Sequence, residues 1–237
     1  MSGQRARLKA AVLAALIAQT IAAGTPGAAG GPLVQRLLLV DGRVAARAAP
    51  RADAAVVGAI PGRTPLTGAR TVVPVLASAV GPAGGRWLRV RLPLRPNGGT
   101  GWVPAAAGTA AETPWRIVVH RAARQADVLE QGRVRATFPV VVGKPATPTP
   151  LGSFFVVEKL HLAPGVTEGP WALAISAYSN VLHEFAGGVG QVGLHGTVGL
   201  TDPLGTQASH GCVRFGVRAI TWIAARVDAG TPVVVER

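Results

Sequence analysis

Ser209-His210-Gly211-Cys212-Val213-Arg214 contains the only cysteine of this 237-residue chain, so no intramolecular disulfide can form. A solitary thiol between a histidine–glycine pair and an arginine is typical of a nucleophile, because a neighbouring base or cation favours the reactive thiolate. The alternative is a buried cysteine that acts as a small apolar side chain. We regard the nucleophile as the stronger interpretation.

A histidine suited to activate this thiol stands at the end of the apolar segment Gln191–His195, where we expect a strand. The thirteen residues between His195 and Ser209 can return the chain and bring the imidazole beside Cys212. A free thiol is mostly protonated at neutral pH, and an imidazole can take its proton. His210 competes for this role, but its position suits it better to shaping the turn, so we favour His195.

The glycine before the cysteine suggests how charge on a substrate would be stabilised. Gly211 allows a tight backbone approach, and the amide groups of Gly211 and Cys212 can together face a developing oxyanion. His195, His210 and Cys212 can alternatively be interpreted as zinc ligands. A zinc site normally has a fourth ligand or a water position and a supporting shell, so we predict no metal and no other cofactor.

The first thirty residues have the pattern of an export signal. Arg5, Arg7 and Lys9 precede an apolar run, and small residues follow it. We therefore expect residues 1–29 to be a signal peptide or leader, and the mature protein to be extracytoplasmic, in the cell envelope. A retained membrane anchor is the alternative, but the apolar run is short for one.

Positive charge is concentrated in the first half of the chain. The formal net charge is +13, and residues 30–110 hold ten arginines but only two aspartates. Outside the cytoplasm nucleic acid is not the expected partner, so we expect anionic wall polymers or acidic lipid head groups to meet this basic surface. A solvated face without a specific partner is equally compatible with the composition.

The composition favours strands and turns. The chain has 31 glycines, 19 prolines and recurring valine runs, which predict a mainly β fold. Only the last thirty residues have a clear helical period, followed by Gly230 and a strand at 233–235. The apolar residues of this helix, which we expect to pack on a sheet, are Ile220, Ile223, Ala224 and Val227.

Two domains are predicted, joined by a linker at residues 106–114, where small residues dominate. Residues 35–105 contain short apolar segments between Gly and Pro turns, which predict a small barrel. This segment resembles the bacterial SH3-like family, whose members bind cell-wall peptides or glycans or space a catalytic domain. The proline-rich stretch 93–99 departs from the tight turn usual in that family.

Residues 115–237 resemble the L,D-transpeptidase catalytic domain, also called the YkuD domain. The resemblance combines the proline-threonine loop 147–152, the strand end His195-Gly196-Thr197 and the signature 209–214, in this order and spacing. It implies a β-sandwich catalytic domain with a C-terminal helix. It also implies Cys212 as nucleophile, His195 as base and the Gly196 carbonyl as the group that orients the imidazole.

The same resemblance implies further site residues. The amides of His210, Gly211 and Cys212 would form the oxyanion hole, and Arg214 would support the loop or the substrate. We expect Ser209 to bind the substrate. In the family, the region matching residues 165–190 forms a flap over the substrate groove. We expect Tyr178, within this region, as a substrate contact.

The implied activity is acyl transfer on peptidoglycan stem peptides. Cys212 would attack the carbonyl of the third residue of a tetrapeptide stem, release the terminal D-alanine and form a thioester. An amine from a second stem would then give a 3→3 cross-link, whereas water would make the protein an L,D-carboxypeptidase. Carbapenems are expected to acylate the same thiol. A non-catalytic wall-binding protein is the third alternative, and the intact Cys212 and His195 argue against it.

Overall fold

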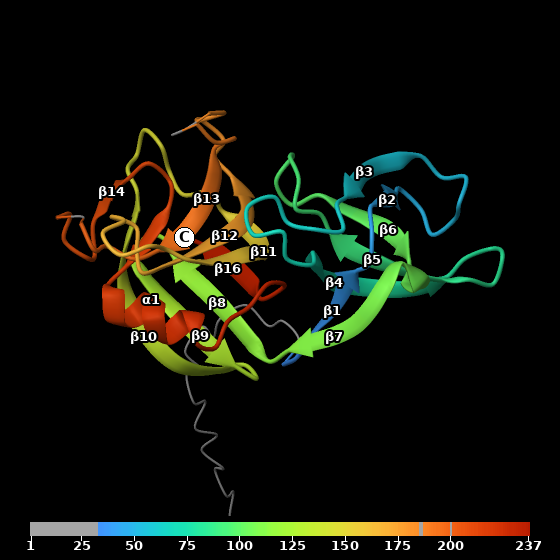
Figure 1. The fold of residues 1–237 in the computed structure, drawn as a ribbon, viewed down its shortest axis with the longest axis horizontal. Helices are drawn as coiled ribbons and strands as arrows, with labels where there is room; N and C mark the ends of the chain where they lie inside the picture. Colours follow the sequence, from blue (N-terminus) through green and yellow to red (C-terminus); the bar gives the residue numbers. More distant parts are fainter. Residues whose placement is uncertain (1–32, 185–186, 200) are drawn as a thin grey trace, which may run out of the picture.

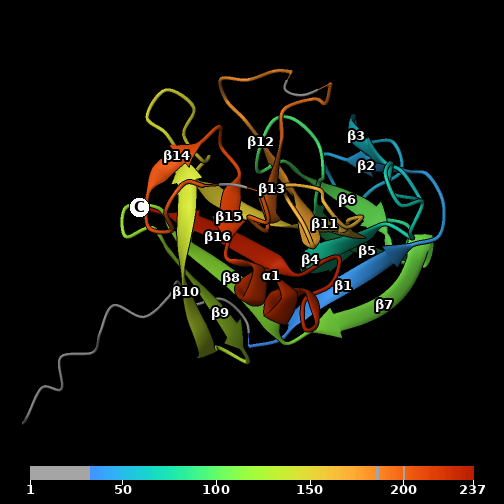
Figure 2. The ribbon, with the colours of Figure 1, turned by 60° about the vertical axis from the view of Figure 1, so that its left-hand side comes forward.

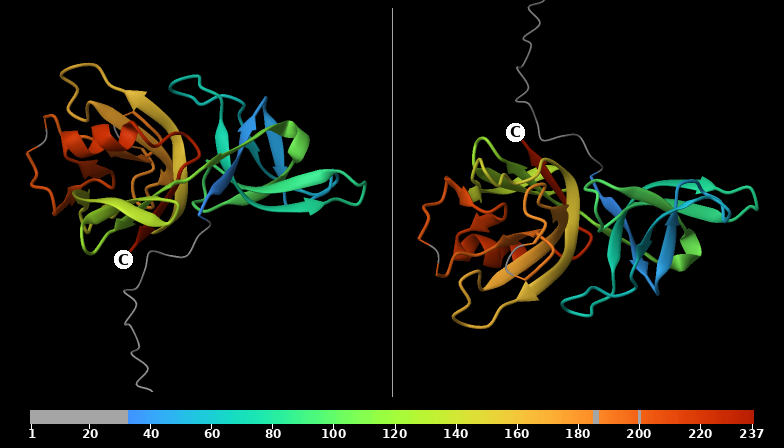
Figure 3. Two further views of the ribbon diagram at one scale, coloured as in Figure 1. Left: turned by 90° about the horizontal axis from the view of Figure 1, so that it is seen from below. Right: turned by 90° about the horizontal axis from the view of Figure 1, so that it is seen from above.

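The computed structural model describes residues 33–184, 187–199 and 201–237, and the predicted leader at 1–29 lies outside them. The described chain is mainly β with one α-helix. It forms two lobes that lie side by side: the N-terminal lobe contains β1–β7, and the C-terminal lobe contains β8–β16 and α1 (Figures 1 and 3). Over the described ranges, no helix has both the length and the apolar character needed to cross a membrane.

The N-terminal lobe is a seven-stranded antiparallel sheet in the order β3-β2-β6-β5-β4-β1-β7. Its elements are β1 (Gln35–Val40), β2 (Val44–Arg47), β3 (Val56–Ile60), β4 (Val72–Val80), β5 (Arg86–Arg91), β6 (Thr100–Pro104), the single 3₁₀ turn η1 (Ala105–Ala107) and β7 (Gly108–Thr113). Leu38, Val40 and Ile60 lie in its buried core. The SH3-like identity of this lobe stays a prediction.

The segment predicted as a free linker, residues 106–114, is largely strand β7. β7 pairs with β1 from Gln35–Thr113 to Val40–Gly108. This pairing satisfies the backbone groups of the segment, which is why a stretch of small residues with little side-chain packing is nevertheless ordered as a strand. The two lobes are therefore joined through a strand that belongs to the first sheet.

The C-terminal lobe is a nine-stranded mixed sheet in the order β14-β10-β15-β13-β12-β11-β16-β8-β9, and β10 also pairs with β9. This extra pairing closes the sheet on itself, because β10 is long enough to pair with β9 near its start and with β15 and β14 near its end. Its elements are β8 (Trp115–His120), β9 (Gln125–Glu130), β10 (Arg133–Gly143), β11 (Gly152–His161), β12 (Trp171–Tyr178), β13 (Gln191–His195), β14 (Gln207–Ser209), β15 (Val213–Phe215), α1 (Val217–Ala224) and β16 (Pro232–Glu236).

Part of the stretch predicted as a flap, residues 165–190, is instead the inner strand β12. β12 lies between β11 and β13 and contributes Leu173, Ile175 and Ala177 to the core. These three alternate along the strand, as expected for one face of a sheet. The residues of this stretch before Trp171 and after Tyr178 lie outside the strand.

The predicted helical stripe is confirmed for Ile220, Ile223 and Ala224, which are buried on α1, whereas Val227 is buried beyond the end of the helix. The helix is shorter than its apolar period suggests: α1 ends at Ala224, and Gly230 follows well beyond the end with a positive φ of 88°. α1 packs beside the sheet (Figure 2).

Strand β11 carries apolar side chains on both faces. Phe154 and Val156 pack in the core of the C-terminal lobe, whereas Phe155 and Val157 pack in the core of the N-terminal lobe. The next residue, Glu158, is 2% exposed and accepts hydrogen bonds from the backbone and hydroxyl of a loop in the N-terminal lobe. The two lobes therefore share a buried interface built on one strand.

Candidate active site

The register between β13 and β15 places the predicted nucleophile and base on one face of the sheet. These strands are parallel, with Leu194 opposite Val213 and His195 opposite Arg214. Leu194 and Val213 are fully buried in the core. Because side chains alternate along a strand, His195, Arg214 and Cys212 lie together on the opposite face. Figure 2 shows β13 and β15 between β10 and β12.

Gly193 lies across from Cys212 and donates its backbone amide to the sulfur, at an N to Sγ distance of 3.4 Å. The thiol is half-buried. Burial raises the pKa of Cys212, and the Gly193 amide and the cation of Arg214 oppose this rise. Sequence reasoning missed Gly193, although a glycine inside a strand is a signal of close approach by another group.

His195 is held by the residue that follows it. Its Nδ1 lies 2.8 Å from the Gly196 carbonyl oxygen. A carbonyl only accepts, so Nδ1 carries the proton and Nε2 of the neutral ring is left as an acceptor. Burial lowers the pKa of His195, and the hydrogen bond to Gly196 opposes this effect. The site therefore contains an oriented imidazole with a basic nitrogen.

Gly196 cannot be replaced without local movement. A Cβ at this position would lie 1.9 Å from the Gly169 carbonyl oxygen, far inside van der Waals contact. The Gly196 amide also donates to the Glu168 carbonyl at 2.9 Å. The carbonyl that orients His195 is thus fixed by close packing against the turn at 168–169.

His210, the competing histidine, is exposed and its Nε2 lies 3.2 Å from Lys144 Nζ. This contact directs the ring toward the loop that follows β10. The geometry therefore distinguishes the two candidates: His195 is buried on the face of Cys212, whereas the His210 side chain interacts with Lys144.

The turn before the cysteine is held by its own hydroxyl groups and by the proline-threonine loop. Ser209 Oγ donates to the Cys212 carbonyl at 2.6 Å and accepts the Gly211 amide at 3.1 Å. Thr149 Oγ1 donates to the Gly211 carbonyl at 2.9 Å. Gly211 has φ of 124°, a conformation that favours glycine. The sequence interpretation of this loop as part of the site fits these contacts.

Two predicted roles bear on groups that the turn itself uses. Ser209 is fully buried, and its hydroxyl is used inside the turn, so its role as a substrate contact stays a prediction. The Gly211 amide donates to Ser209 Oγ, and its part in an oxyanion hole stays a prediction. In both cases the turn satisfies its own polar groups, which the sequence does not reveal.

Arg214 pairs with Asp202, a residue that sequence reasoning did not single out. The arginine side chain is 13% exposed, and its Nε is buried without a hydrogen-bond partner among the described residues. Its positive charge lowers the pKa of both Cys212 and His195. Arg214 therefore contributes a fixed cation to the face that carries the nucleophile and base.

Tyr178 ends β12 and faces the N-terminal lobe. Its hydroxyl donates to the Pro93 carbonyl at 3.0 Å, and the Arg95 guanidinium lies 4.9 Å from its ring centroid. The substrate contact predicted for Tyr178 stays a prediction, and its hydroxyl is occupied by the contact between lobes in this structure.

A small pocket of about 20 Å³ opens at Cys212. It is lined by residues of the Cys212 turn and of the segment after β12, namely Ser179, Leu182, Gly190, Gln191, Val192, His210, Gly211 and Cys212. We refer to it as the Cys212 pocket. Its volume suits about one water molecule, so an acyl donor must lie over its mouth or widen it.

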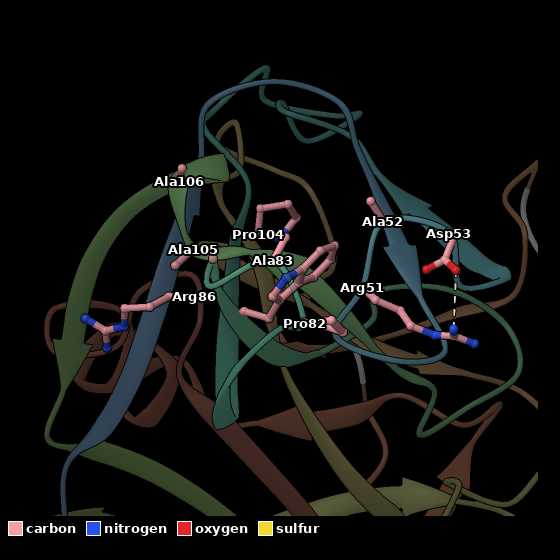
Figure 4. Close-up of a pocket in the computed structure, with 11 residues that line it drawn as sticks. Arg51, Ala52, Asp53, Pro82, Ala83, Arg86, Pro104, Ala105 and Ala106 are labelled. Atoms are coloured by element: carbon pink, nitrogen blue, oxygen red, sulfur yellow. Dashed lines mark hydrogen bonds and ion pairs between the residues drawn. The ribbon is translucent and has the colours of Figure 1, made fainter.

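A larger cavity of about 790 Å³ lies in the N-terminal lobe, near Pro82, Trp87 and Pro104 (Figure 4). Figure 4 shows Arg51 directed toward Asp53, an ion pair of 3.2 Å. Trp87 is only 9% exposed. The cavity holds no nucleophile, so the chemistry is better placed at the smaller Cys212 pocket. Within the described ranges, no group of three or more His, Cys, Asp or Glu side chains is arranged to hold a metal ion.

Comparison with known proteins gives relatives for the C-terminal lobe. Aligned segments of the YkuD proteins of Bacillus subtilis and Bacillus licheniformis are 29% identical over 124 residues and 32% identical over 120 residues. They span 52% and 51% of this chain, and 67% and 64% of those proteins. The chain thus matches about two thirds of the length of these curated relatives.

Solved structures are also similar. An L,D-transpeptidase from Mycobacterium smegmatis is 18% identical, with a TM-score of 0.43, and the match covers 70% of this chain and 99% of that one. L,D-transpeptidase 3 from Mycobacterium tuberculosis, in complex with a faropenem-derived adduct, is 17% identical, with a TM-score of 0.46, and the match covers 70% and 91%.

A family model described as the L,D-transpeptidase catalytic domain matches residues 114–235, slightly more than half of the chain. These residues include the whole C-terminal lobe up to β16, with Cys212, His195 and the loop that holds their turn. The chain belongs to the L,D-transpeptidase catalytic domain family.

Proposed function

We propose that this protein is a cysteine-dependent L,D-transpeptidase that acts on peptidoglycan tetrapeptide stems. The observation that carries the proposal is the common face of Cys212 and His195, with the imidazole oriented through the Gly196 carbonyl. This arrangement provides a nucleophile, a base and a group that orients the base. Family membership supports the same class of reaction.

In the first half-reaction, His195 Nε2 takes the proton of the Cys212 thiol as the sulfur attacks the carbonyl carbon of the third stem residue. The carbonyl oxygen becomes an oxyanion. When it collapses, the bond from that carbon to the nitrogen of the terminal D-alanine breaks, and the His195 imidazolium protonates the leaving amine. The product is a thioester on Cys212.

In the second half-reaction, a second stem peptide provides the acceptor. The side-chain amine of its residue at position three attacks the thioester. His195 accepts a proton from this amine, a C–N bond forms, and the C–S bond breaks. The proton returns to the sulfur, and a 3→3 cross-link is released. Water in place of the amine would give a tripeptide, so the balance between these acceptors separates a transpeptidase from a carboxypeptidase.

The resting pair is inferred to be a neutral thiol and a neutral imidazole. Burial raises the pKa of Cys212 and lowers the pKa of His195, and both shifts disfavour the charged forms. The Gly193 amide and Arg214 then favour the thiolate as it forms. The amides of His210, Gly211 and Cys212 are the proposed oxyanion donors.

The setting of the reaction is also a proposal. A leader at residues 1–29 would export the protein to the cell envelope, where peptidoglycan lies. The arginines of residues 30–110 would meet anionic wall polymers there. Carbapenems would acylate Cys212 because ring opening of a β-lactam is the same attack of sulfur on a carbonyl carbon.

To test the proposal, the leader-free protein and its Cys212→Ala variant are each incubated with a purified disaccharide-tetrapeptide. The products are identified by mass spectrometry. A dimer that lacks one alanine and requires Cys212 supports transpeptidation. Tripeptide alone assigns the protein as a carboxypeptidase. Equal activity of Cys212→Ala overturns the cysteine mechanism. Binding of the intact tetrapeptide without either product favours a wall-binding role.

Intact-protein mass spectrometry after exposure to a carbapenem tests the nucleophile independently of the acceptor. We expect the mass to rise by one carbapenem on the wild-type protein and to stay unchanged on Cys212→Ala. An unmodified wild-type protein after prolonged exposure contradicts the proposed inhibitor chemistry.

A further inference from the structure

The proline-rich stretch 93–99 of the N-terminal lobe lies against the end of β12 in the C-terminal lobe. Arg95 bridges two carbonyl groups there: Nη1 donates to Ser179 and Nη2 donates to Val189, each at 3.0 Å. Ser179 follows β12 directly, and Val189 comes shortly before β13. One guanidinium thus holds both the outgoing and the returning ends of the segment between these strands.

Asn97 of the same stretch binds the last residue of β12 through both of its side-chain polar atoms. Its Nδ2 donates to the Tyr178 carbonyl at 2.7 Å, and its Oδ1 accepts the Tyr178 amide at 2.8 Å. The amide side chain therefore pairs with Tyr178 as a neighbouring strand would. Asn97 Nδ2 also contacts Asn180 Oδ1 at 3.3 Å.

The residues that Arg95 and Asn97 hold lead directly into the Cys212 pocket. The Ser179 amide donates to the Gly190 carbonyl at 2.8 Å, and Ser179 Oγ accepts the Leu182 amide at 2.9 Å. Ser179, Leu182 and Gly190 all line the Cys212 pocket. The wall opposite the Cys212 turn is therefore one short network, and its outer attachments lie in the other lobe.

We propose that Arg95 and Asn97 of the N-terminal lobe are positioning residues of the active site, which fix the pocket wall formed by Ser179, Leu182 and Gly190 and thereby set the recognition of the acyl-donor stem. The N-terminal lobe then contributes to substrate binding through the shape of the site. The kinetic part of this inference rests on the proposed function.

The size of the Cys212 pocket makes this positioning consequential. With a volume of about 20 Å³, a small displacement of Ser179 or Gly190 changes how a stem peptide fits over Cys212. The contacts that hold the Cys212 turn come from Thr149 and Ser209, within the C-terminal lobe. Loss of Arg95 is therefore expected to alter donor binding more than the reactivity of the thiol.

Hydrogen–deuterium exchange tests the structural part without any need for turnover. In Arg95→Ala and Asn97→Ala, peptides that cover residues 178–182 should exchange about tenfold faster than in the wild-type protein. Arg89→Ala is the matched control, because Arg89 is also an exposed arginine of the N-terminal lobe, and its side-chain hydrogen bonds with the described residues go to Thr100 Oγ1 of its own sheet. Its exchange over residues 178–182 should match the wild-type protein.

Binding and kinetics test the functional part. In a Cys212→Ala background, the Kd for disaccharide-tetrapeptide should rise about threefold to tenfold on Arg95→Ala or Asn97→Ala, the range expected for one or two lost hydrogen bonds. In the active background KM should rise by a similar factor, kcat should change less than twofold, and alkylation of Cys212 by iodoacetamide should keep its rate. Arg89→Ala should change none of these.

The outcomes separate the two proposals. Unchanged exchange at residues 178–182, or faster exchange with unchanged Kd, overturns the positioning role. A fall in kcat without a change in KM or Kd also overturns it, because the residues would then act on the chemistry. If the wild-type protein gives neither product, the proposed reaction fails, and the positioning role is still decided by exchange and by Kd in the Cys212→Ala background.

Discussion

On one side of the Cys212 pocket, the turn at 209–212 is held by hydroxyl groups of its own lobe, from Thr149 and Ser209. On the other side, the wall at Ser179 and Gly190 is attached to Arg95 of the N-terminal lobe. The hydrogen bond from Thr149 to the turn is buried, whereas the two hydrogen bonds of Arg95 are partly or fully exposed. The comparison suggests that reactivity of the sulfur and recognition of the donor depend on different parts of the chain.

Replacement of the base gives the largest expected effect and tests which histidine of the C-terminal lobe activates Cys212. His195→Ala should lower kcat/KM for the tetrapeptide by about 10³, a typical contribution of general acid–base catalysis. His210→Ala is the matched control and should stay within about threefold of the wild-type protein, because its ring contacts Lys144. Equal losses in the two variants would contradict the assignment of His195.

Phe155→Ala tests how firmly the two lobes are coupled. Phe155 is fully buried, and it projects from β11 into the core of the N-terminal lobe. Its truncation should lower the free energy of unfolding by about 3–5 kcal/mol. Urea unfolding should give one transition, shifted to lower concentration. The exposed Val56 of the same lobe provides a control, since Val56→Ala should be nearly neutral. Two separate unfolding transitions in the wild-type protein would contradict the proposed coupling of the two lobes through a shared buried interface.

Gly196→Ala probes the packing that orients the base. The added methyl would clash with the Gly169 carbonyl, so we expect a loss of about 1–3 kcal/mol in unfolding free energy, typical of overpacking. Because the Gly196 carbonyl orients His195, kcat should fall as well. A Cβ at Gly85 meets no atom within 4 Å, so Gly85→Ala should change neither quantity. If Gly196→Ala keeps the stability and kcat of the wild-type protein, the turn at 168–169 can move to make room for the added methyl group.

The pH profile of kcat/KM gives the smallest and finest test. The active form has a neutral His195 and a Cys212 thiol, so a lowered histidine pKa moves the acid limb to lower pH and a raised thiol pKa moves the alkaline limb to higher pH. Arg214 lowers both pKa values, so Arg214→Gln should shift both limbs upward. Arg89→Gln should leave the limbs in place. If both limbs of the pH profile stay in place in Arg214→Gln, the proposed electrostatic effect of Arg214 is contradicted.

The pattern of the sequence predicted the reactive half of the site well. β13 has the expected bounds, because it is an apolar run that ends at a histidine. His195, Cys212 and the threonine loop were found because their residue types carry the chemistry or restrict the backbone. The helix was found from its apolar period, but its end was placed too far along the chain because Gly230 was taken as the cap.

The side of the Cys212 pocket formed by Ser179, Leu182 and Gly190 could not be predicted in the same way. β12 was interpreted as part of a flap because aromatic residues and glycines surround it, and its alternation was overlooked. Arg95, Asn97 and Asp202 act through contacts with residues distant in the sequence, which no local pattern reveals. The buried Ser209 hydroxyl also depends on the closed geometry of the turn.

Strand β11, whose faces belong to two cores, also bears on the order in which the chain acquires structure during synthesis. Strands β1–β7 leave the ribosome first. Phe155 and Val157, which complete their core, are made only after strands β8–β10 of the second sheet. We expect the nascent N-terminal lobe to remain open until β11 arrives. A chain arrested before that strand would expose an unfinished apolar surface and should depend on chaperones for its solubility.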